Sequence, residues 1–487
     1  GVPADAVSAE ADRLVMKGRL FSETVGDDTF LYEAIQYKNE KYIAEKLYRI
    51  KRGSAPLDFK DIEAFIRKEE AQNRIEYADE QKKAIFNAMT SGVLVLTGGP
   101  GTGKTTVVTA IINIFECLGL EVALAAPTGR AAKRMSEATG REAKTIHRLL
   151  EVDYSGSELT PIFRRNERNP LKCDTLIVDE MSMVDTLLFD SLLRALPFHS
   201  RLVMVGDSDQ LPSVGAGNVL HDLIRSDILP SVKLDTIFRQ AAESMIVTNA
   251  HDIVNGEYPY LESKDNDFFF LPRQTESECA SAVCQLCEKR LPKSYGFSPL
   301  WDIQVLCPGK RGEAGTWNLN IELQKRLNPP DGKKKEFRHG GHLFREGDKV
   351  MQTRNDYDMT WSKDDGEVGR GVFNGDIGII EKMDPIGRMM AIRFDDRVAE
   401  YPFDSANELD HAYAVTVHKS QGSEFEAVIL PLFEANSRLY YRNLLYTAVT
   451  RAKKLLIIVG SARAVMAMVD NNRKSGRFTN LRFMMKD

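Results

Sequence analysis

A glycine-rich segment that ends in lysine and threonine has the clearest chemistry in the sequence. Residues 98–105 read GGPGTGKT, directly after the apolar run Val93–Leu96 and directly before a helical pattern. Glycines let backbone N–H groups approach phosphates, and a helix N-terminus adds partial positive charge. Lys104 would hold the outer phosphates, and the Thr105 hydroxyl would bind Mg²⁺. A structural glycine turn is the alternative. The residues expected at the nucleotide are Gly98, Gly99, Gly101, Thr102, Gly103, Lys104, Thr105 and Thr106.

Two adjacent carboxylates follow another apolar run. Leu176–Val178 ends in Asp179 and Glu180, about 75 residues after the glycine-rich segment. Asp179 at the strand end suits the Mg²⁺ shell, and Glu180 would orient and deprotonate an attacking water. A solvated strand end is the alternative for this pair taken alone. Together with residues 98–105, the pair indicates hydrolysis of the nucleotide as well as binding.

Three further side chains suit a phosphoryl-transfer site. Gln210 follows the apolar run Leu202–Val205, and its neutral amide can donate to a phosphate oxygen or to water. Arg239 and Arg451 are candidate arginine fingers, because a planar guanidinium suits the charge that spreads over the transferred phosphoryl group. The alternative for each of the three is an ordinary surface position.

The elements that must position these residues are short, continuous apolar runs. Such runs are typical of parallel strands covered by helices on both faces, which favours an α/β fold with two similar cores. The first series is Val93–Leu96, Val122–Ala125, Leu176–Val178 and Leu202–Val205, and the second is Ile303–Leu306, Ala427–Leu430 and Leu455–Val459.

The rest of the chain has other patterns. Residues 1–75 predict a helix, a hairpin across residues 26–28 and a second helix, as in a small winged-helix-like region. Residues 338–410 have the short strands and turns of a β-rich insertion. We therefore expect a first core over residues 76–240, with a hairpin insertion at about 151–172, and a second core over residues 241–487.

Composition excludes several classes of protein. The 487 residues carry 65 basic and 70 acidic side chains, a net charge of −5, so a uniformly basic nucleic-acid coat is excluded but a locally basic channel is not. No apolar run approaches the roughly 18 residues of a membrane span, and the first residue, Gly1, suggests a trimmed start. Cys279, Cys284 and Cys287 fall on an amphipathic pattern, which favours buried helix positions over a metal site.

Further segments appear in a fixed order around these residues. Together they resemble superfamily 1 DNA helicases of the RecD-like branch, within it the stand-alone RecD-like enzymes, over about residues 77–465. The segments are Gln81, residues 125–131 (AAPTGRA), Asp179-Glu180, residues 206–214 (GDSDQLPSV), residues 238–240 (FRQ), residues 416–425 (TVHKSQGSEF) and residues 447–452 (TAVTRA).

The resemblance implies an architecture and an ATP site. Relatives have two RecA-like cores, an SH3-like module that corresponds to residues 338–410, and a β-hairpin pin that splits the duplex. By resemblance Gln81 would contact adenine, and Gln210 would couple the γ-phosphate to DNA. Arg239 and Arg451 would complete the site from the second core, and Gly422 and Glu424 would lie at the nucleotide, with Glu424 near the ribose. ATP and Mg²⁺ are the implied cofactors.

Single-stranded DNA is the implied polymer. Loops at the carboxyl ends of parallel strands suit contacts to phosphates without sequence readout. A packed helix residue is the alternative for His147, and a loop with a solvated arginine face is the alternative for the pin. The candidate DNA contacts are Pro127, Thr128, Arg130, Thr145, His147, Arg148, Thr416, His418 and Gln421.

The sequence thus predicts an ATP-driven helicase that acts on single strands and duplex junctions in DNA repair or recombination. Movement 5′→3′ comes from the resemblance alone, and a monomeric motor with partners such as single-strand-binding protein is also expected. The expected cytoplasmic location comes from the cysteine usage, which fits a reduced cytosol. Two alternatives stay open. The chain could act chiefly as a subunit of a nuclease complex, or it could be an RNA-directed helicase of the same superfamily.

Overall fold

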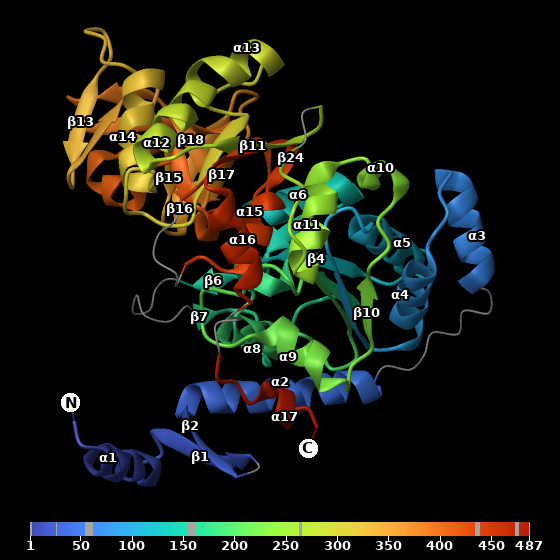
Figure 1. Cartoon of the computed structure of the whole chain (residues 1–487). Helices are drawn as coiled ribbons and strands as arrows, with labels where there is room; N and C mark the ends of the chain where they lie inside the picture. Colours follow the sequence, from blue (N-terminus) through green and yellow to red (C-terminus); the bar gives the residue numbers. More distant parts are fainter. Residues whose placement is uncertain are drawn as a thin grey trace.

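The computed structural model describes residues 2–25, 27–53, 62–153, 162–262, 265–433, 439–472 and 477–486. Two parallel sheets with helices on their faces form the centre of the molecule, and a β-rich module extends from the second sheet (Figure 1). The helices in these ranges are all too short or too polar to cross a bilayer.

The first sheet has six parallel strands in the order β10-β3-β9-β8-β4-β5. Strands β3, β8 and β9 are buried along their whole length because helices cover both faces, as the apolar runs predict. The strands are β3 (Val93–Gly98), β4 (Val122–Ala126), β5 (Ala143–Thr145), β8 (Thr175–Val178), β9 (Arg201–Gly206) and β10 (Ser231–Leu234). The helices of this core are α4 (Asp79–Thr90), α5 (Lys104–Cys117), α6 (Gly129–Thr139), α7 (Ile146–Leu149), η1 (Met181–Met183), α8 (Thr186–Ala195) and α9 (Val219–Ser226).

The second sheet has five parallel strands in the order β11-β24-β23-β12-β22. Its strands are β11 (Phe268–Pro272), β12 (Ile303–Cys307), β22 (Ala414–Thr416), β23 (Phe425–Leu432) and β24 (Ala452–Gly460). Its helices are α10 (Arg239–Ala242), α11 (Met245–Asn255), α12 (Glu276–Gln285), η2 (Leu286–Arg290), α13 (Leu291–Tyr295), α14 (Thr316–Leu327), η4 (Val417–Ser420), α15 (Arg442–Val449) and α16 (Ala462–Asp470). Cys279, Cys284 and Cys287 are buried in the apolar core of this half, which confirms the buried-helix interpretation.

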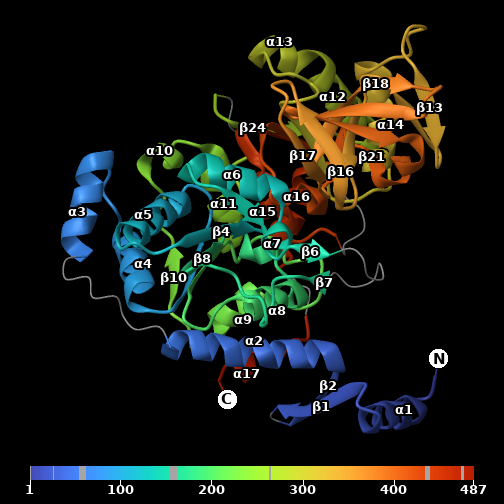
Figure 2. The ribbon, with the colours of Figure 1, turned by 180° about the vertical axis from the view of Figure 1, so that it is seen from behind.

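The β-rich insertion is a seven-stranded antiparallel sheet in the order β17-β16-β20-β19-β18-β15-β21, with its own apolar core. It lies against the second parallel sheet and faces the first core (Figure 2). Its strands are β15 (Lys349–Gln352), β16 (Asp356–Lys363), β17 (Val368–Val372), β18 (Ile377–Asp384), β19 (Met389–Phe394), β20 (Arg397–Pro402) and β21 (Leu409–His411), with η3 (Phe403–Glu408). A separate hairpin, β13 (Glu336–His339) and β14 (His342–Arg345), precedes it.

The N-terminal region confirms the expected helix, hairpin and second helix. It contains α1 (Ala4–Met16), β1 (Leu20–Val25) paired with β2 (Asp28–Glu33), and the long helix α2 (Ala34–Gly53), followed by α3 (Ile62–Asn73). The helix α2 runs across the base of the first core, beside the C-terminal helix α17 (Leu481–Met484) (Figure 1). Ile43, Leu47 and Ile50 join the apolar core of that half.

A short hairpin stem leaves the first core where the insertion was expected. Strands β6 (Val152–Asp153) and β7 (Ile162–Phe163) pair antiparallel, with Val152 opposite Phe163. The predicted turn at Ser155-Gly156 lies outside the described residues.

Candidate nucleotide site and strand-binding surface

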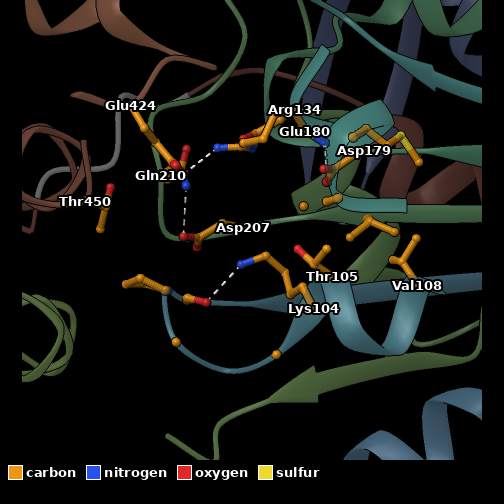
Figure 3. A pocket seen from close by; sticks show the side chains of 18 of the residues that line it. Lys104, Thr105, Val108, Arg134, Asp179, Glu180, Asp207, Gln210, Glu424 and Thr450 are labelled. Atoms are coloured by element: carbon orange, nitrogen blue, oxygen red, sulfur yellow. Dashed lines mark hydrogen bonds and ion pairs between the residues drawn. The ribbon is translucent and has the colours of Figure 1, made fainter. Parts of the chain in front are cut away.

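A cavity of about 330 Å³ lies between the two cores, at the carboxyl ends of the first sheet's strands. Lys104, Asp179 and Glu180 reach it from the first core, and Glu424 reaches it from the second (Figure 3). Arg451 of the second core lines it too. Residues that lie more than 340 positions apart in the chain therefore face one space. Of the predicted nucleotide and catalytic residues, those that line the cavity are Gly99, Gly101, Gly103, Lys104, Thr105, Asp179, Glu180, Gln210, Glu424 and Arg451.

The conformation of the glycine-rich loop is fixed by its own backbone and by a hydrogen bond from Gln81. Gly101 and Gly103 have φ of 74° and 76°, a conformation that glycine adopts without strain. The Lys104 ammonium donates to the carbonyls of Gly98 (2.5 Å) and Gly99 (2.9 Å). The buried Gln81 amide donates to the Thr102 carbonyl at 3.2 Å. Gln81 thus supports the loop from behind, outside the residues that line the cavity.

The two carboxylates differ in their surroundings. Arg134 on α6 donates to Glu180 at 2.5 Å and to Glu424 of the second core at 2.5 Å. Burial alone would raise the pKa of Glu180, but the positive charges of Arg134, Arg451 and Lys104, with the Arg134 hydrogen bond, together hold this pKa below its ordinary value. Burial and the neighbouring Glu180 charge raise the pKa of Asp179. Glu180 also has φ of 54°, a strained conformation for this residue type.

The loop after β9 connects the cavity to the second core. Gln210 donates to Asp207 at 3.1 Å, and the Tyr446 hydroxyl donates to the same carboxylate at 2.6 Å. Burial and the nearby Asp207 charge raise the pKa of Tyr446 well above its ordinary range. The backbone of Leu211 is held on both sides by the second core, by Thr447 at 3.0 Å and by Gln421 at 3.0 Å. Gln210 is therefore linked, through Asp207, to a side chain of the opposite core.

Arg451 is fixed within the second core. It is only 2% exposed, and it donates to the carbonyls of Thr447 and Ser423 at 3.2 Å each. These bonds aim a buried guanidinium at the cavity, as expected for a residue that acts on a ligand from the opposite core. The side chain of Arg239 lies outside the described part of the structure.

A second cavity, of about 300 Å³, separates the first core from the β-rich insertion. Arg130, Thr145 and Arg148 line it from the first core, and Trp361 and Phe373 line it from the insertion. Arg130 also lies over the Phe425 ring at 5.8 Å. The cavity combines aromatic rings with charged side chains of both signs, because Asp376, Asp395 and Asp396 line it as well.

Comparison of this chain with known protein families and structures agrees with this arrangement. Three family models match, the AAA domain at residues 81–216, the ATP-dependent RecD-like DNA helicase SH3 domain at residues 319–394 and the UvrD-like helicase C-terminal domain at residues 411–459. The RecBCD enzyme subunit RecD of Mycobacterium tuberculosis is 32% identical over 447 residues, which cover 84% of this chain and 73% of that protein. This chain belongs to the RecD-like helicase family.

Another RecD-like relative shows higher identity over a shorter stretch. The ATP-dependent RecD2 DNA helicase of Deinococcus radiodurans is 38% identical over 387 residues, which cover 80% of this chain. The match spans about half, 49%, of that relative's length. Among solved structures, a Bacteroides Pif1 helicase in complex with ADP-AlF3 and single-stranded DNA is 20% identical with a TM-score of 0.47, over 81% of this chain and 94% of that one.

With the RecD-like architecture in place, the predicted strand contacts fall into two groups. Arg148 is exposed and Pro127, Thr128, Arg130, Thr416 and His418 are partly exposed, whereas Thr145 and Gln421 are buried. The hydroxyls of Thr128 and Thr145 cap helices α6 and α7 through the N–H groups of Ala131 and Arg148. Gln421 is 6% exposed and bonds to Leu211, so the structure places it between the cores instead of on the surface.

The two predicted histidines have apolar or aromatic surroundings. His147 packs beside the rings of Phe163 (5.9 Å) and Tyr357 (6.2 Å), and burial lowers its pKa. Burial also lowers the pKa of His418. Both side chains are therefore neutral at pH 7, and they offer rings and ring nitrogens instead of positive charge.

Five nucleotide-site predictions fall beside the RecD-like cavity instead of in it, namely Gln81, Gly98, Thr102, Thr106 and Gly422. Thr106 follows Thr105 on α5 but does not line the cavity. Gly422 has φ of 70°, and a Cβ there would meet the Thr128 hydroxyl at 2.7 Å. Glycine at this position therefore permits close approach of the two cores.

Arg134 is the functional candidate that sequence reasoning missed. Its only signal is helical spacing, because it lies four residues after Arg130 on the predicted helix and so on the same face. The local sequence around Arg134 does not show that this helix face contacts Glu180, which is 46 residues further along the chain.

Proposed function

We propose that this chain is an ATP-driven DNA helicase that moves 5′→3′ along single-stranded DNA and separates duplexes. The observation that carries the proposal is the shared cavity, in which Lys104, Glu180 and Arg451 from opposite cores can contact one nucleotide. A nucleotide that bridges two cores couples its hydrolysis to their relative movement. The RecD-like relative named an ATP-dependent DNA helicase supports the choice of ATP and DNA.

The side chains at the cavity fit a magnesium nucleotide. The Thr105 hydroxyl and the Asp179 carboxylate supply oxygen ligands, which Mg²⁺ prefers, while phosphates and water complete its shell. Bound there, Mg²⁺ would neutralise charge on the phosphates. Glu180 would orient the attacking water, and Arg134 would hold the Glu180 carboxylate ionised and in place. Arg239 and Arg451 would stabilise the transferred phosphoryl group.

We place the single strand along the outer surface of both cores. Thr128, Arg130 and Arg148 would contact it on the first core, with Thr416 and His418 on the second. The β6–β7 stem supports a duplex-splitting pin at about residues 151–172. The proposed division is an N-terminal region over residues 1–75, a first core over 76–240 and a second core over 241–487. A monomeric cytoplasmic motor in repair, acting with single-strand-binding protein, completes the proposal.

The test measures ATPase activity and unwinding together. We expect Lys104→Ala to lower ATP turnover at least 100-fold, because it removes a charge from the phosphate site. Lys82→Ala, which removes a lysine that pairs with Glu70 on the surface, is the matched control and should keep full activity. The wild-type chain should be stimulated by DNA more than by RNA and should unwind duplexes with a 5′ tail.

Three results would count against the proposal. Wild-type turnover in Lys104→Ala would contradict the nucleotide site. Stronger stimulation by RNA than by DNA would favour the RNA-directed alternative. Unwinding that requires a 3′ tail would reverse the polarity.

A further inference from the structure

A third cavity, which touches the second core, lies away from the nucleotide cavity. It has a volume of about 590 Å³ and opens between helix α14, the β13–β14 hairpin and the segment from β21 to η4. We call it the α14 pocket. None of the residues that line it lines the nucleotide cavity. Its purpose is therefore not explained by ATP hydrolysis.

The α14 side of the pocket presents two large apolar side chains to solvent. Trp317 is 55% exposed and Ile321 is 54% exposed. They lie four residues apart on α14, so they share one face of the helix. Exposed large apolar side chains that cluster in a hollow mark a binding site more often than a chance surface feature. A tryptophan ring of this kind is a stacking platform for a flat ligand.

The charges that line the pocket are mainly positive. Lys310, Arg338 and Lys419 line it, as do Lys325 and Arg345, against the single carboxylate of Asp410 among the described lining residues. An apolar floor with cations around it matches a base flanked by phosphates. Lys325 and Arg345 already pair with Glu322 and Glu336, and a purely apolar peptide would supply no anion for Lys310, Arg338 and Lys419.

Hydrogen bonds hold the walls of the pocket in place. Asn320 and Ala414 form a reciprocal pair, with the amide nitrogen donating at 2.9 Å and the side-chain oxygen accepting at 2.9 Å. The Gln324 amide donates to the Leu343 carbonyl of the hairpin at 2.8 Å. Because α14 is tied to both neighbouring walls, the pocket is formed before any ligand arrives, which lowers the entropy lost on binding.

The pocket is continuous with the proposed strand surface of the second core. Thr416, one of the proposed strand contacts, lines it together with Lys419. We infer that the α14 pocket takes one unstacked base of the bound single strand, with Trp317 stacked on the base and with Lys310 and Arg338 at the flanking phosphates. This inference rests on the proposed function, because it needs a strand on the second core.

Trp317→Ala tests the stacking contact. We expect its dissociation constant for a labelled oligothymidylate to rise by about 5- to 150-fold, the range that loss of one stacked base produces. Trp317→Phe should keep most of the affinity. Trp301→Ala is the matched control, since Trp301 is 43% exposed and does not line the pocket. Maximal ATPase activity at saturating DNA should stay at the wild-type level in all three variants, because the nucleotide cavity is untouched.

A second variant tests the charges independently of the ring. In Lys310→Gln/Arg338→Gln, the slope of log affinity against log salt should fall by about 1.4, since each phosphate contact to a single strand contributes about 0.7. Equal affinity of Trp317→Ala and Trp301→Ala for the oligonucleotide, with stimulation of ATPase by DNA intact, would overturn the inference and leave the proposed function standing. Absence of any DNA binding by the wild-type chain would instead overturn the proposed function.

Discussion

At the scale of single residues, the two adjacent carboxylates of the nucleotide cavity have different surroundings and therefore different pKa values. Glu180 faces the Arg134 guanidinium, which together with the Arg451 and Lys104 charges keeps the pKa of Glu180 low despite burial. Burial, and after it the neighbouring Glu180 charge, raise the pKa of Asp179. A residue that orients water must stay ionised, whereas a metal ligand becomes ionised when the cation binds. The two carboxylates are thus prepared for different tasks before the nucleotide binds.

This arrangement gives Arg134 a measurable effect. We expect Arg134→Ala to lower ATP turnover by about 10- to 100-fold, because a hydrogen bond to a charged group contributes about 1.5–3 kcal/mol. Arg134→Lys should recover part of the loss, since it keeps the charge but cannot contact Glu180 and Glu424 at once. The measurement is steady-state ATPase kinetics with kcat and KM determined separately.

Arg141→Ala serves as the control for Arg134→Ala. Arg141 follows the same helix and pairs with Glu116 at the surface, so its removal should leave turnover unchanged. A rise in KM with unchanged kcat in Arg134→Ala would show that Arg134 binds the nucleotide and does not position Glu180.

The sequence predicts the part of the site that lies in contiguous segments. Lys104, Asp179 and Glu180 each follow a recognisable apolar run, and the structure brings them to one cavity. Arg134 escapes prediction because its partners are distant in the chain. Gln421 was predicted to contact single-stranded DNA, yet the structure buries it against Leu211. Local sequence does not reveal how closely the two cores approach each other.

At the scale of elements, the buried strands are the most predictable part of the fold. A parallel strand covered on both faces must be apolar throughout, so β3, β8 and β9 stand out in the sequence. The order of the strands in the sheet cannot be read from the sequence in this way, because β9 lies between β3 and β8 in the sheet although it comes after both in the chain. That order depends on contacts between helices and strands far apart in the chain.

The β-rich insertion is anchored at its two ends by one buried carboxylate. Asp348 is fully buried just before β15, and it accepts hydrogen bonds from Asn328 (2.7 Å), Gln324 (2.6 Å) and Tyr413 (2.9 Å). These donors come from α14 and from the chain after β21. The carboxylate therefore ties the entry and the exit of the insertion to the second core.

We expect Asp348→Ala to lower the free energy of unfolding by at least about 3 kcal/mol, because it leaves several buried donors without an acceptor. Urea denaturation and limited proteolysis of the insertion measure the effect. Asp410→Ala is the control, since Asp410 lies near the same junction but is exposed, and it should change stability by less than about 0.5 kcal/mol. Equal stability of the two variants would show that Asp348 is not the anchor.

At the scale of the whole molecule, helix α2 of the N-terminal region and the C-terminal helix α17 meet at the base of the first core. Helix α2 lies beside α17 there (Figure 2). The Glu40 carboxylate on α2 accepts a hydrogen bond from the Asn480 N–H at 2.8 Å. Glu40 and the neighbouring Asp222 are both buried, and burial raises their pKa values, to about 7 and about 6. The last residues are therefore held to the first core through carboxyl groups whose protonation changes near neutral pH.

The sign of the resulting pH dependence follows from the raised pKa of Glu40. Between its ordinary pKa of 4.5 and about 7, the folded state binds more protons than the unfolded state, so the free energy of unfolding falls as pH rises through this range. The loss is complete above about pH 7 and amounts to about 3 kcal/mol at most, at 1.36 kcal/mol per unit. Glu40→Gln keeps an oxygen for the Asn480 N–H but cannot ionise.

We therefore expect Glu40→Gln to be more stable than the wild type above pH 7, with the difference shrinking as pH falls toward 4.5. Urea denaturation from pH 5 to 8 measures this difference in the free energy of unfolding. The contributions of the eight histidines to the pH dependence cancel in the difference, because both proteins carry them. The contribution of Asp222, whose pKa is raised to about 6, cancels in the same way, so the difference between the two proteins changes over the Glu40 range from about pH 4.5 to 7. Glu45→Gln, an exposed position on the same helix, should follow the wild-type profile. Parallel profiles for Glu40→Gln and the wild type would show that Glu40 does not control how the chain's last helix binds to the first core.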